Sequence, residues 1–290
     1  MVILLNGEPV TSTEVEVDAA SPMWLSGQSL FETMRIRREG VTGIFGLEAH
    51  LERLVASAER LGWTGCPLLR RLHRWVGRAS LIFRRSTREE GRLRLTVAWT
   101  RREGPPVTVV TVTPYKPPEK PAAVISTAMA IPWTGDPAAK VGSRFLYDAA
   151  WAKAARAGAD EAILVDREGR PVEGSRSNVF VALNDCIATP PLDLGPLAGV
   201  ARRTVLELAI EAGCRVEERP LAWEELHEGA PFLSNALWGV RLVRTLDGRP
   251  CGGPVEVVRH LRALYERQVK RTLERQKALV AADETTCYNQ

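Results

Sequence analysis

A short proline-rich segment constrains the fold of this 290-residue chain more than any other feature. The stretch TPYKPPEKPAA, residues 113–123, holds four prolines in a polar setting. Such a composition is typical of a stiff, extended connection between domains. We therefore predict an N-terminal α/β domain at residues 1–113, a linker at 114–122 and a C-terminal α/β domain at 123–290.

Hydrophobic patterning on each side of this segment predicts an α+β chain. Hydrophobic residues make up 45% of the sequence, which is enough for a sizeable core. Before the segment, strands are expected at residues 2–5, 14–18, 30–36, 93–99 and 107–112, and helices at 47–61 and 67–83. After it, strands are expected at 123–129, 161–165, 172–183 and 231–243, and helices at 147–157, 200–212 and 255–275.

Composition and charge argue against several classes of protein. The net charge of +4 is too small for a dedicated nucleic-acid binder. Five cysteines are scattered and four histidines lack metal-ligand spacing, so neither a disulfide framework nor a metal site is indicated, and the histidines are expected on the surface or on helix faces. No apolar run approaches the roughly 20 residues that cross a bilayer, and MVILLNGEPV is too short for a secretory signal. We expect a protein of the reducing cytoplasm that binds neither membrane nor nucleic acid.

Lys140 is the first candidate for chemistry. It is one of only six lysines, and it lies in DPAAKVGSRFLYDAAW, among small and apolar residues before a predicted helix. An amine in such surroundings loses solvation, which favours its neutral, nucleophilic form, and such an amine can form a Schiff base with a carbonyl. The alternative is an ordinary solvated lysine in a loop.

Glu173 stands at the threshold of a buried strand in RPVEGSRSNVFVAL, residues 170–183. An isolated buried charge is costly, by several kcal/mol, so this carboxylate needs a partner. That partner is either a protein group, through a turn or a salt bridge to Arg170 or Arg176, or a bound cation. A protonated pyridine nitrogen is one such cation.

Three further places have the chemistry of anion binding. Arg53 lies on the predicted helix 47–61 but away from its stripe of leucines, so it faces either solvent or an anion. Gly199 precedes the predicted helix 200–212, where the amides of Val200 and Ala201 carry the positive end of the helix dipole. Ser-Asn-Ala interrupts the predicted strand 231–243, so Asn235 and Ala236 mark either a bulge or backbone amides that open onto a cleft.

The order of these signals along the chain identifies a family. The segments are GQSLFETMRI (27–36), HLERL (50–54), the Lys140 segment, GADEAILVDREGRPVEGSRSNVF (158–180), TPPLDLGPLAGVARRTV (189–205) and SNALWGV (234–240). In this order they resemble the class IV pyridoxal-phosphate enzymes, which include branched-chain and D-amino-acid aminotransferases and 4-amino-4-deoxychorismate lyase. The resemblance covers nearly the whole chain. It implies the two-domain α+β architecture of fold type IV, a homodimer, and a cofactor between the domains.

The resemblance also implies roles for individual residues. Lys140 corresponds to the lysine that forms a Schiff base with pyridoxal 5'-phosphate and moves the α-proton of the substrate. Glu173 corresponds to the acid that pairs with the pyridine nitrogen. Arg53 and the backbone amides of Val200 and Ala201 correspond to groups that bind the phosphate. Asn235 and Ala236 correspond to a break whose amides lie near the phosphate and the substrate carboxylate.

Within this family the residues favour the lyase. Arg144 and the break Asn235-Ala236-Leu237 resemble the lyase, and Phe145 stands where aminotransferases commonly have a tyrosine against the ring oxygen. The lyase takes a small amino compound, 4-amino-4-deoxychorismate, eliminates pyruvate and releases 4-aminobenzoate, a folate precursor.

Two features keep a transaminase of branched-chain or D-amino acids open as an alternative. After the strand that carries Arg94, relatives have a glycine-rich loop that starts with Arg-Gly, whereas TRREGPPVTVV nearly lacks glycine. Tyr147 is also a second candidate for the missing contact with the ring oxygen. A third hypothesis is a non-catalytic protein that binds anions through its Arg-rich first domain.

Overall fold

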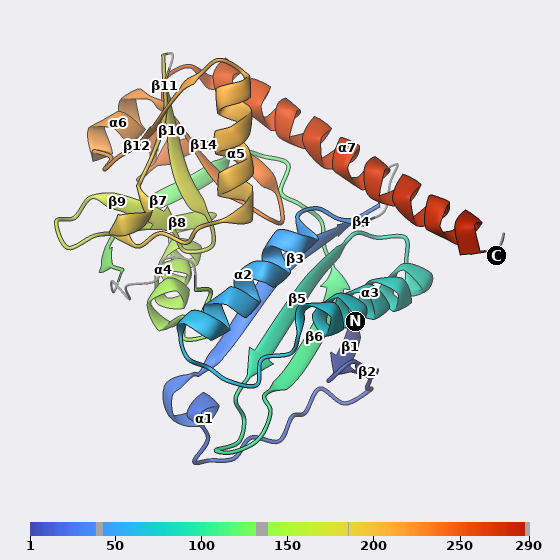
Figure 1. The fold of residues 1–290 in the computed structure, drawn as a ribbon. Coiled ribbons are helices and arrows are strands. Elements are labelled where there is room, and N and C mark those ends of the chain that lie inside the picture. The colour runs from blue at the N-terminus through green and yellow to red at the C-terminus, as the bar shows by residue number, and fades with distance from the viewer. Residues whose placement is uncertain (39–42, 132–138, 185, 288–290) are drawn as a thin grey trace. The chain divides into compact units, whose positions relative to one another are not determined.

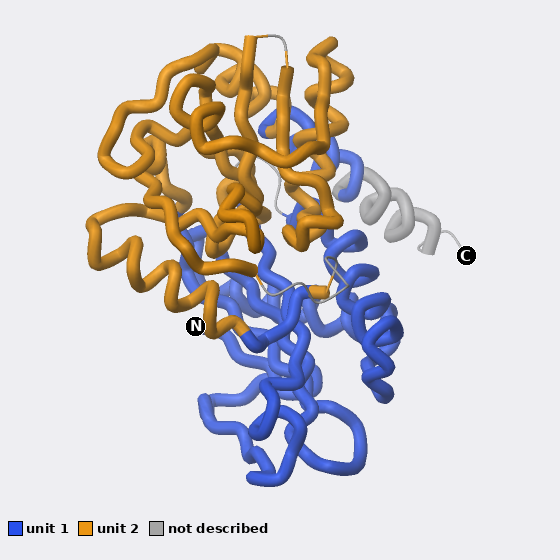
Figure 2. The backbone as a smooth tube through the Cα atoms, turned by 90° about the vertical axis from the view of Figure 1, so that its left-hand side faces the viewer, with its two compact units in different colours: residues 1–116, 140–143, 266–290 blue, residues 117–139, 144–265 orange. Residues whose placement is uncertain are grey.

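The structure is a computed structural model that describes residues 1–38, 43–131, 139–184 and 186–287, with side chains of the last helix described to residue 276. The chain forms two compact units (Figure 2). The first contains Met1–Lys116, Lys140–Ser143 and Glu266–Gln290, and the second contains Pro117–Ala139 and Arg144–Tyr265. The cut after Lys116 falls inside the predicted linker, whereas Lys140 and the end of the chain group with the first unit. In this respect the units differ from the predicted assignment of residues 123–290 to one domain.

The first unit is an antiparallel sheet with two helices on one face (Figure 1). Its strands are β1 (Val2–Leu5), β2 (Glu8–Pro9), β3 (Ser29–Arg37), β4 (Gly43–Ile44), β5 (Gly91–Ala98) and β6 (Val107–Pro114), in the order β2-β1-β6-β5-β3-β4. A short helix, α1 (Pro22–Ser26), precedes β3. The helix α2 (Leu47–Arg60) packs against β3, and α3 (Leu69–Ser86) packs against β1, β5 and β6.

Strand alternation and helical stripes together build the core of the first unit. Leu93, Leu95 and Val97 are buried at every second position of β5, as the period of a half-buried strand requires. Leu54 of α2 and Val76 of α3 cover them from the helical layer. Apolar periodicity therefore predicts this half of the fold well.

The second unit is a mixed sheet that closes on itself. Its strands are β7 (Ala122–Ala130), β8 (Glu161–Val165), β9 (Pro171–Gly174), β10 (Asn178–Leu183), β11 (Cys186–Thr189), β12 (Arg215–Glu218), β13 (Ala230–Asn235), β14 (Gly239–Leu246) and β15 (Arg249–Pro250). They follow the order β12-β11-β10-β13-β14-β7-β8-β9, with β15 beside β14. Because β9 also pairs with β10, through Asn178 and Glu173, the strands from β10 round to β9 form a ring.

Helices cover the strands of the second unit. The helix α4 (Phe145–Arg156) packs on β7 and β8, α5 (Val200–Glu211) on β12 and β13, and α6 (Trp223–Glu228) on β10 and β13. A 3-10 turn, η1 (Leu192–Leu194), precedes α5, and α7 (Val255–Cys287) begins in this unit and continues into the first. Phe180 of β10 and Phe232 of β13 stack with centroids 4.9 Å apart.

One strand prediction is wrong, and two others are wrong in part. Residues 14–18 are exposed and lie outside any strand, because their two valines have no sheet to cover. The predicted strand 172–183 is two strands, β9 and β10, separated by the polar turn 175–177. The predicted strand 231–243 is likewise a hairpin of β13 and β14, with its turn at 236–238.

In the part of the chain that the structure describes, no helix combines the length and the apolar character needed to cross a bilayer.

Candidate active site

In the first unit, a buried cluster joins β3 to α2. Glu32 of β3 is fully buried, and it accepts hydrogen bonds from Arg53 Nε at 2.7 Å and Arg53 Nη2 at 2.6 Å. His50 Nδ1 lies 2.7 Å from Glu32 Oε2. Because His50 and Arg53 are three residues apart, they lie on one face of the helix and reach the same carboxylate.

This cluster has a defined charge state. Burial opposes ionisation of Glu32, but the charge of Arg53 and the hydrogen bonds from Arg53 and His50 outweigh it and lower the pKa of Glu32 to about 2. Burial lowers the pKa of His50, so the imidazole is neutral near pH 7. An ionised carboxylate can only accept, so the proton of the neutral ring sits on Nδ1.

The cluster corrects one prediction from the sequence, for His50, and excludes one of the two alternatives left open for Arg53. His50 lies on a face of α2, but that face is buried and not at the surface, and its Nε2 has no hydrogen-bond partner among the described residues. Arg53 does not face solvent, because Glu32 holds its guanidinium with two bonds, and its side chain is 9% exposed. The sequence signal for this cluster was Glu32 itself, a lone acid inside the apolar strand SLFETM.

Lys140 lies against the same strand. Phe31 N–H donates to the Lys140 carbonyl oxygen at 3.0 Å, and Gly142 N–H donates to the Ser29 carbonyl oxygen at 2.7 Å. These backbone bonds explain why Lys140–Ser143 groups with the first unit. A Cβ at Gly142 would lie 2.0 Å from Ser29 Oγ, so a larger residue here would force the Ser29 side chain to move.

The Phe31 ring is shared by two cations. Lys140 Nζ lies 4.8 Å from the ring centroid, and the guanidinium carbon of Arg94 lies 3.8 Å from it. Both distances are in the range of a cation–π contact. The charge of Lys140 also contributes to the low pKa of His50, after burial, so the amine and the Glu32 cluster belong to one electrostatic neighbourhood.

In the second unit, Glu173 is the buried acid of β9. Its Oε1 accepts from the Tyr147 hydroxyl at 2.9 Å, and its Oε2 accepts from the Leu197 N–H at 3.0 Å. Arg170, which the sequence offered as a salt-bridge partner of Glu173, instead binds Asp166 at 2.6 Å. The carboxylate therefore has protein donors on both oxygens, from α4 and from the segment before α5.

A second buried acid shapes the turn that follows Glu173. Glu161 of β8 accepts from the hydroxyls of Ser175 and Ser177 and from the Arg176 N–H. Burial raises the pKa of Glu161, although these hydrogen bonds oppose the rise. No role was predicted for Glu161; its place in the run DEAIL, just before an apolar strand, was the available signal.

The start of α5 has the features of an anion site. Val200 and Ala201 occupy the first helical positions, where backbone N–H groups lack intrahelical partners. Among the described residues no side chain caps this end, and the first turn of the fully described α5 holds no acidic residue. Asn178 Nδ2 donates to the Leu197 carbonyl at 2.8 Å, and a Cβ at Gly199 would lie 2.2 Å from Asn178 Oδ1. The helix start is thus fixed to the strand that pairs with Glu173.

The break in the last predicted strand is a turn closed by its own asparagine. Asn235 Oδ1 accepts from the N–H groups of Leu237 and Trp238 at 3.0 and 3.1 Å, and Asn235 Nδ2 donates to the Arg176 carbonyl at 3.1 Å. Two amides of the break are therefore already bonded. The predicted contacts of Asn235 and Ala236 with a ligand stay predictions.

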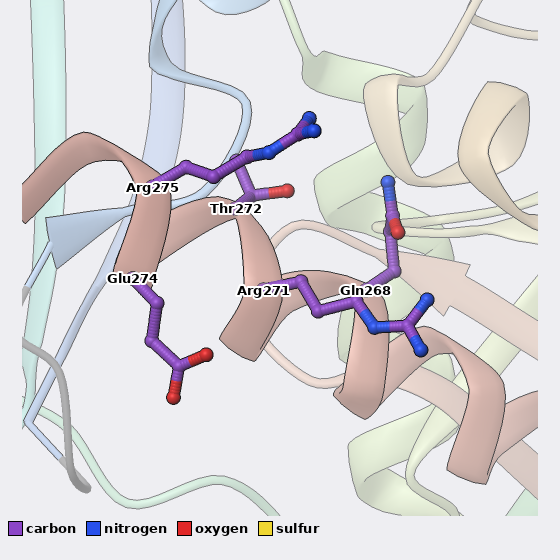
Figure 3. A pocket seen from close by; sticks show the side chains of 5 residues that line it. All are labelled: Gln268, Arg271, Thr272, Glu274 and Arg275. Atoms are coloured by element: carbon purple, nitrogen blue, oxygen red, sulfur yellow. The ribbon is translucent and has the colours of Figure 1, made fainter. Parts of the chain in front are cut away.

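A separate hollow of about 360 Å³ lies along α7 (Figure 3). It is lined by Gln268, Arg271, Thr272, Glu274 and Arg275. Figure 3 shows the Glu274 side chain pointing away from those of Thr272 and Arg275. None of the residues predicted for the site contributes to this hollow, so it has no part in the predicted chemistry.

The structure thus brings the predicted residues together in two groups. Arg53 and Lys140 lie in the first unit; Glu173, Val200, Ala201, Asn235 and Ala236 lie in the second. The first group contains the guanidinium of Arg53, which Glu32 holds in place. The second contains the carboxylate of Glu173, which Tyr147 and Leu197 hold in place. Their assignment to the parts of one cofactor stays a prediction.

Known structures share this architecture. The branched-chain aminotransferase from Thermoproteus uzoniensis, solved with norvaline, matches with a TM-score of 0.84 over 93% of this chain and 94% of that chain. At 24% identity this likeness concerns the fold alone. It confirms the predicted α+β, two-domain fold of the type IV class.

Sequence comparisons define the family. The model for "Amino-transferase class IV" matches residues 29–246, so the chain belongs to the class IV aminotransferase family. The bifunctional aminodeoxychorismate lyase / D-amino acid transaminase of Mycobacterium tuberculosis is 32% identical over 277 residues, 86% of this chain and 92% of that protein. The D-alanine aminotransferase of Bacillus licheniformis is 30% identical over 271 residues, 87% of this chain and 90% of that protein.

Family membership decides the coarser predictions. The family consists of enzymes that use pyridoxal 5'-phosphate, so the predictions of an enzyme and of this cofactor are confirmed. The hypothesis of a non-catalytic anion-binding protein loses its support.

Proposed function

We propose that this protein is an aminodeoxychorismate lyase, which eliminates pyruvate from 4-amino-4-deoxychorismate and releases 4-aminobenzoate. The observation that carries the proposal is the start of α4. Phe145 is 80% exposed and has no hydroxyl, at the position where aminotransferases of this family commonly have tyrosine. Tyr147, the one tyrosine of the fully described α4, donates its hydroxyl to Glu173. The suggestion that Tyr147 replaces the ring-oxygen contact therefore loses its support.

The described residues fit the cofactor. Lys140 supplies an amine, Glu173 supplies a buried carboxylate for the ring nitrogen, and the described start of α5 has no acid or side-chain cap that would compete with a phosphate. When bound, pyridoxal 5'-phosphate supplies an electron-withdrawing ring that makes the substrate α-proton acidic. Lys140 would accept and return that proton at Nζ, and Glu173 would keep the ring nitrogen protonated. Arg53, oriented by Glu32, would bind the phosphate together with the amides of Val200 and Ala201.

A transaminase acting on D-amino acids or branched-chain amino acids is the second candidate. The relative from Mycobacterium tuberculosis is named as bifunctional, lyase and D-amino acid transaminase, and the other relatives described above are named as aminotransferases. The loop TRREGPP, which lacks the glycine-rich sequence of the relatives, supports a different substrate pocket. The name of the Mycobacterium tuberculosis relative indicates that one protein of this family has both the lyase and the transaminase activity.

Two assays separate the candidates. The lyase forms 4-aminobenzoate from 4-amino-4-deoxychorismate with no keto acid present. The transaminase converts an amino donor only when a keto acid is added, and a panel of D-amino acids and branched-chain L-amino acids defines its range. Keto-acid-dependent turnover without any 4-aminobenzoate would refute the lyase proposal and leave the second candidate.

The role of Lys140 has its own test. Purified protein with pyridoxal phosphate is expected to show a visible absorption band that disappears in Lys140→Ala, because the amine that binds the aldehyde is gone. Lys153→Ala, which removes an exposed lysine of α4, serves as the matched control and should keep the band. A band that survives Lys140→Ala would reject this assignment.

The assembly and location follow from the same proposal. A homodimer and a place in the cytoplasm, where a folate precursor is made, are expected of such a lyase. Sedimentation of the purified protein with bound cofactor tests the first expectation.

A further inference from the structure

Tyr147 and Glu173 form a pair that the family resemblance does not assign. The Tyr147 hydroxyl lies 2.9 Å from Glu173 Oε1. Burial, and then the charge of Glu173, raise the pKa of Tyr147, so the phenol stays protonated and is the donor. The ionised carboxylate is the acceptor, because in that form it has no proton to give.

Arg144 holds the tyrosine ring in place. Its guanidinium carbon lies 4.5 Å from the ring centroid, within the range of a cation–π contact. Arg144 Nη2 also donates to the carbonyl oxygen of Ser175, two residues after Glu173. Arg144 is the residue that precedes α4, and Tyr147 lies three residues later in its first turn, so the start of one helix brings both side chains together.

The remaining groups around Glu173 come from its neighbouring elements. Leu197 N–H holds Oε2 from the segment before α5. Glu161 of β8 is committed to the turn 175–177, and Arg176 is part of that turn. The Tyr147 hydroxyl is thus a side-chain donor that acts on the acid itself, on the oxygen that Leu197 does not bind.

We propose that Tyr147 is a positioning residue that keeps Glu173 ionised and correctly oriented for the ring nitrogen of the cofactor. A hydrogen bond donated to a carboxylate favours its charged form, and a charged acid is what holds a pyridine nitrogen protonated. The inference rests on the proposed function, because only there does Glu173 meet a cofactor. It also gives Arg144 a second role, since this residue both resembles the lyase pattern and orients the tyrosine.

The first test needs no cofactor. Glutamate carboxyl carbons are labelled with ¹³C, the Glu173 signal is assigned with Glu173→Gln, and the protein is titrated by NMR. Tyr147→Phe keeps the ring under Arg144 and removes only the hydroxyl. The midpoint of Glu173 is expected to rise by about one pH unit, as the loss of a charge-assisted hydrogen bond predicts. Tyr265→Phe, which alters a buried tyrosine of α7, should leave the midpoint unchanged. An equal midpoint in wild type and Tyr147→Phe would overturn the proposal.

The second test measures cofactor affinity. The dissociation constant for pyridoxal phosphate is expected to rise about tenfold in Tyr147→Phe at neutral pH. In the Glu173→Gln background the same substitution should have almost no further effect, since Tyr147 acts through the acid. Independent, additive losses would contradict this. If wild type binds no pyridoxal phosphate, the proposed function fails, while the cofactor-free titration still decides whether Tyr147 controls Glu173.

Discussion

Replacement of Glu32 by glutamine tests how the first unit is held together. Glu32 is fully buried between Arg53 and His50, and its pKa falls from 4.5 to about 2 on folding. At about 1.4 kcal/mol per pKa unit, this shift corresponds to roughly 3 kcal/mol of stability at pH 7. Removing one partner of a buried ion pair costs about the same, 3–5 kcal/mol, because Arg53 would keep a buried charge without its anion.

The effect of Glu32→Gln on the unfolding free energy is expected to depend on pH in one direction. Because the pKa is lower in the folded state, the contribution of Glu32 is complete above pH 4.5 and is lost as the pH falls toward 2. The difference in unfolding free energy between wild type and Glu32→Gln should therefore be about 3 kcal/mol at pH 7 and about half of that at pH 3.

Urea unfolding followed by tryptophan fluorescence measures this difference, because Trp63 and Trp99 lie 5.2 Å apart in the first unit. The matched control is Glu8→Gln, which disrupts an ion pair with Arg78 whose side chains are 74% and 43% exposed. It should change the unfolding free energy by less than about 1 kcal/mol. A Glu32→Gln effect that is the same at pH 7 and pH 3 would refute the assignment of an ionised, stabilising carboxylate.

Two further substitutions test the second unit. Gly199→Ala would place a Cβ 2.2 Å from Asn178 Oδ1, so we expect a loss of about 1–3 kcal/mol and weaker binding of pyridoxal phosphate, read from thermal melting and an absorbance titration. Gly77→Ala, whose Cβ would meet open space in α3, should be neutral or stabilising, and equal behaviour of the two variants would count against the close contact. Phe180→Ala removes half of a fully buried aromatic pair and should cost about 3–5 kcal/mol in urea unfolding, whereas Ile210→Ala, at an exposed position of α5, should cost less than about 0.5 kcal/mol.

Periodic apolar patterns predict most of the fold, and they fail where the stabilising contact is not a local stripe of side chains. The predicted helix at 47–61 corresponds to α2, and the predicted strand at 93–99 corresponds closely to β5, because both bury a local stripe of side chains. The short strands β11 and β12 were not predicted: β12 pairs with β11, which lies far from it in sequence, whereas β11 also pairs with its chain neighbour β10 and is simply too short to show a pattern. The predicted strand 172–183 runs through the turn at 175–177, because the residue that holds this turn, Glu161, belongs to another strand.

The candidate site was predictable only where one residue type implies one chemistry. A lone lysine and a lone acid beside apolar segments identified Lys140 and Glu173. A lone acid in an apolar strand also marks Glu32, but it does not reveal the cluster, because Glu32 is separated from His50 and Arg53 by eighteen or more residues and meets them only where β3 packs on α2. The sequence indicates Tyr147 as a candidate, but not its hydrogen bond to Glu173. That contact depends on how α4 packs on β8, which no local sequence pattern shows.

The closure of the second sheet at Glu173 and Asn178 has an evolutionary consequence. The seam is the pairing of β9 with β10, in which Asn178 lies opposite Glu173. Leu197 is hydrogen-bonded to both residues, through its N–H to Glu173 and through its carbonyl oxygen to Asn178. The acid proposed to serve the chemistry therefore also helps to close the sheet. A mutation of Glu173 is therefore expected to reduce both the stability of the fold and the turnover of the enzyme. New substrate preferences in such a lineage are therefore free to arise mainly in segments that do not belong to the seam, such as the exposed loop at residues 101–105.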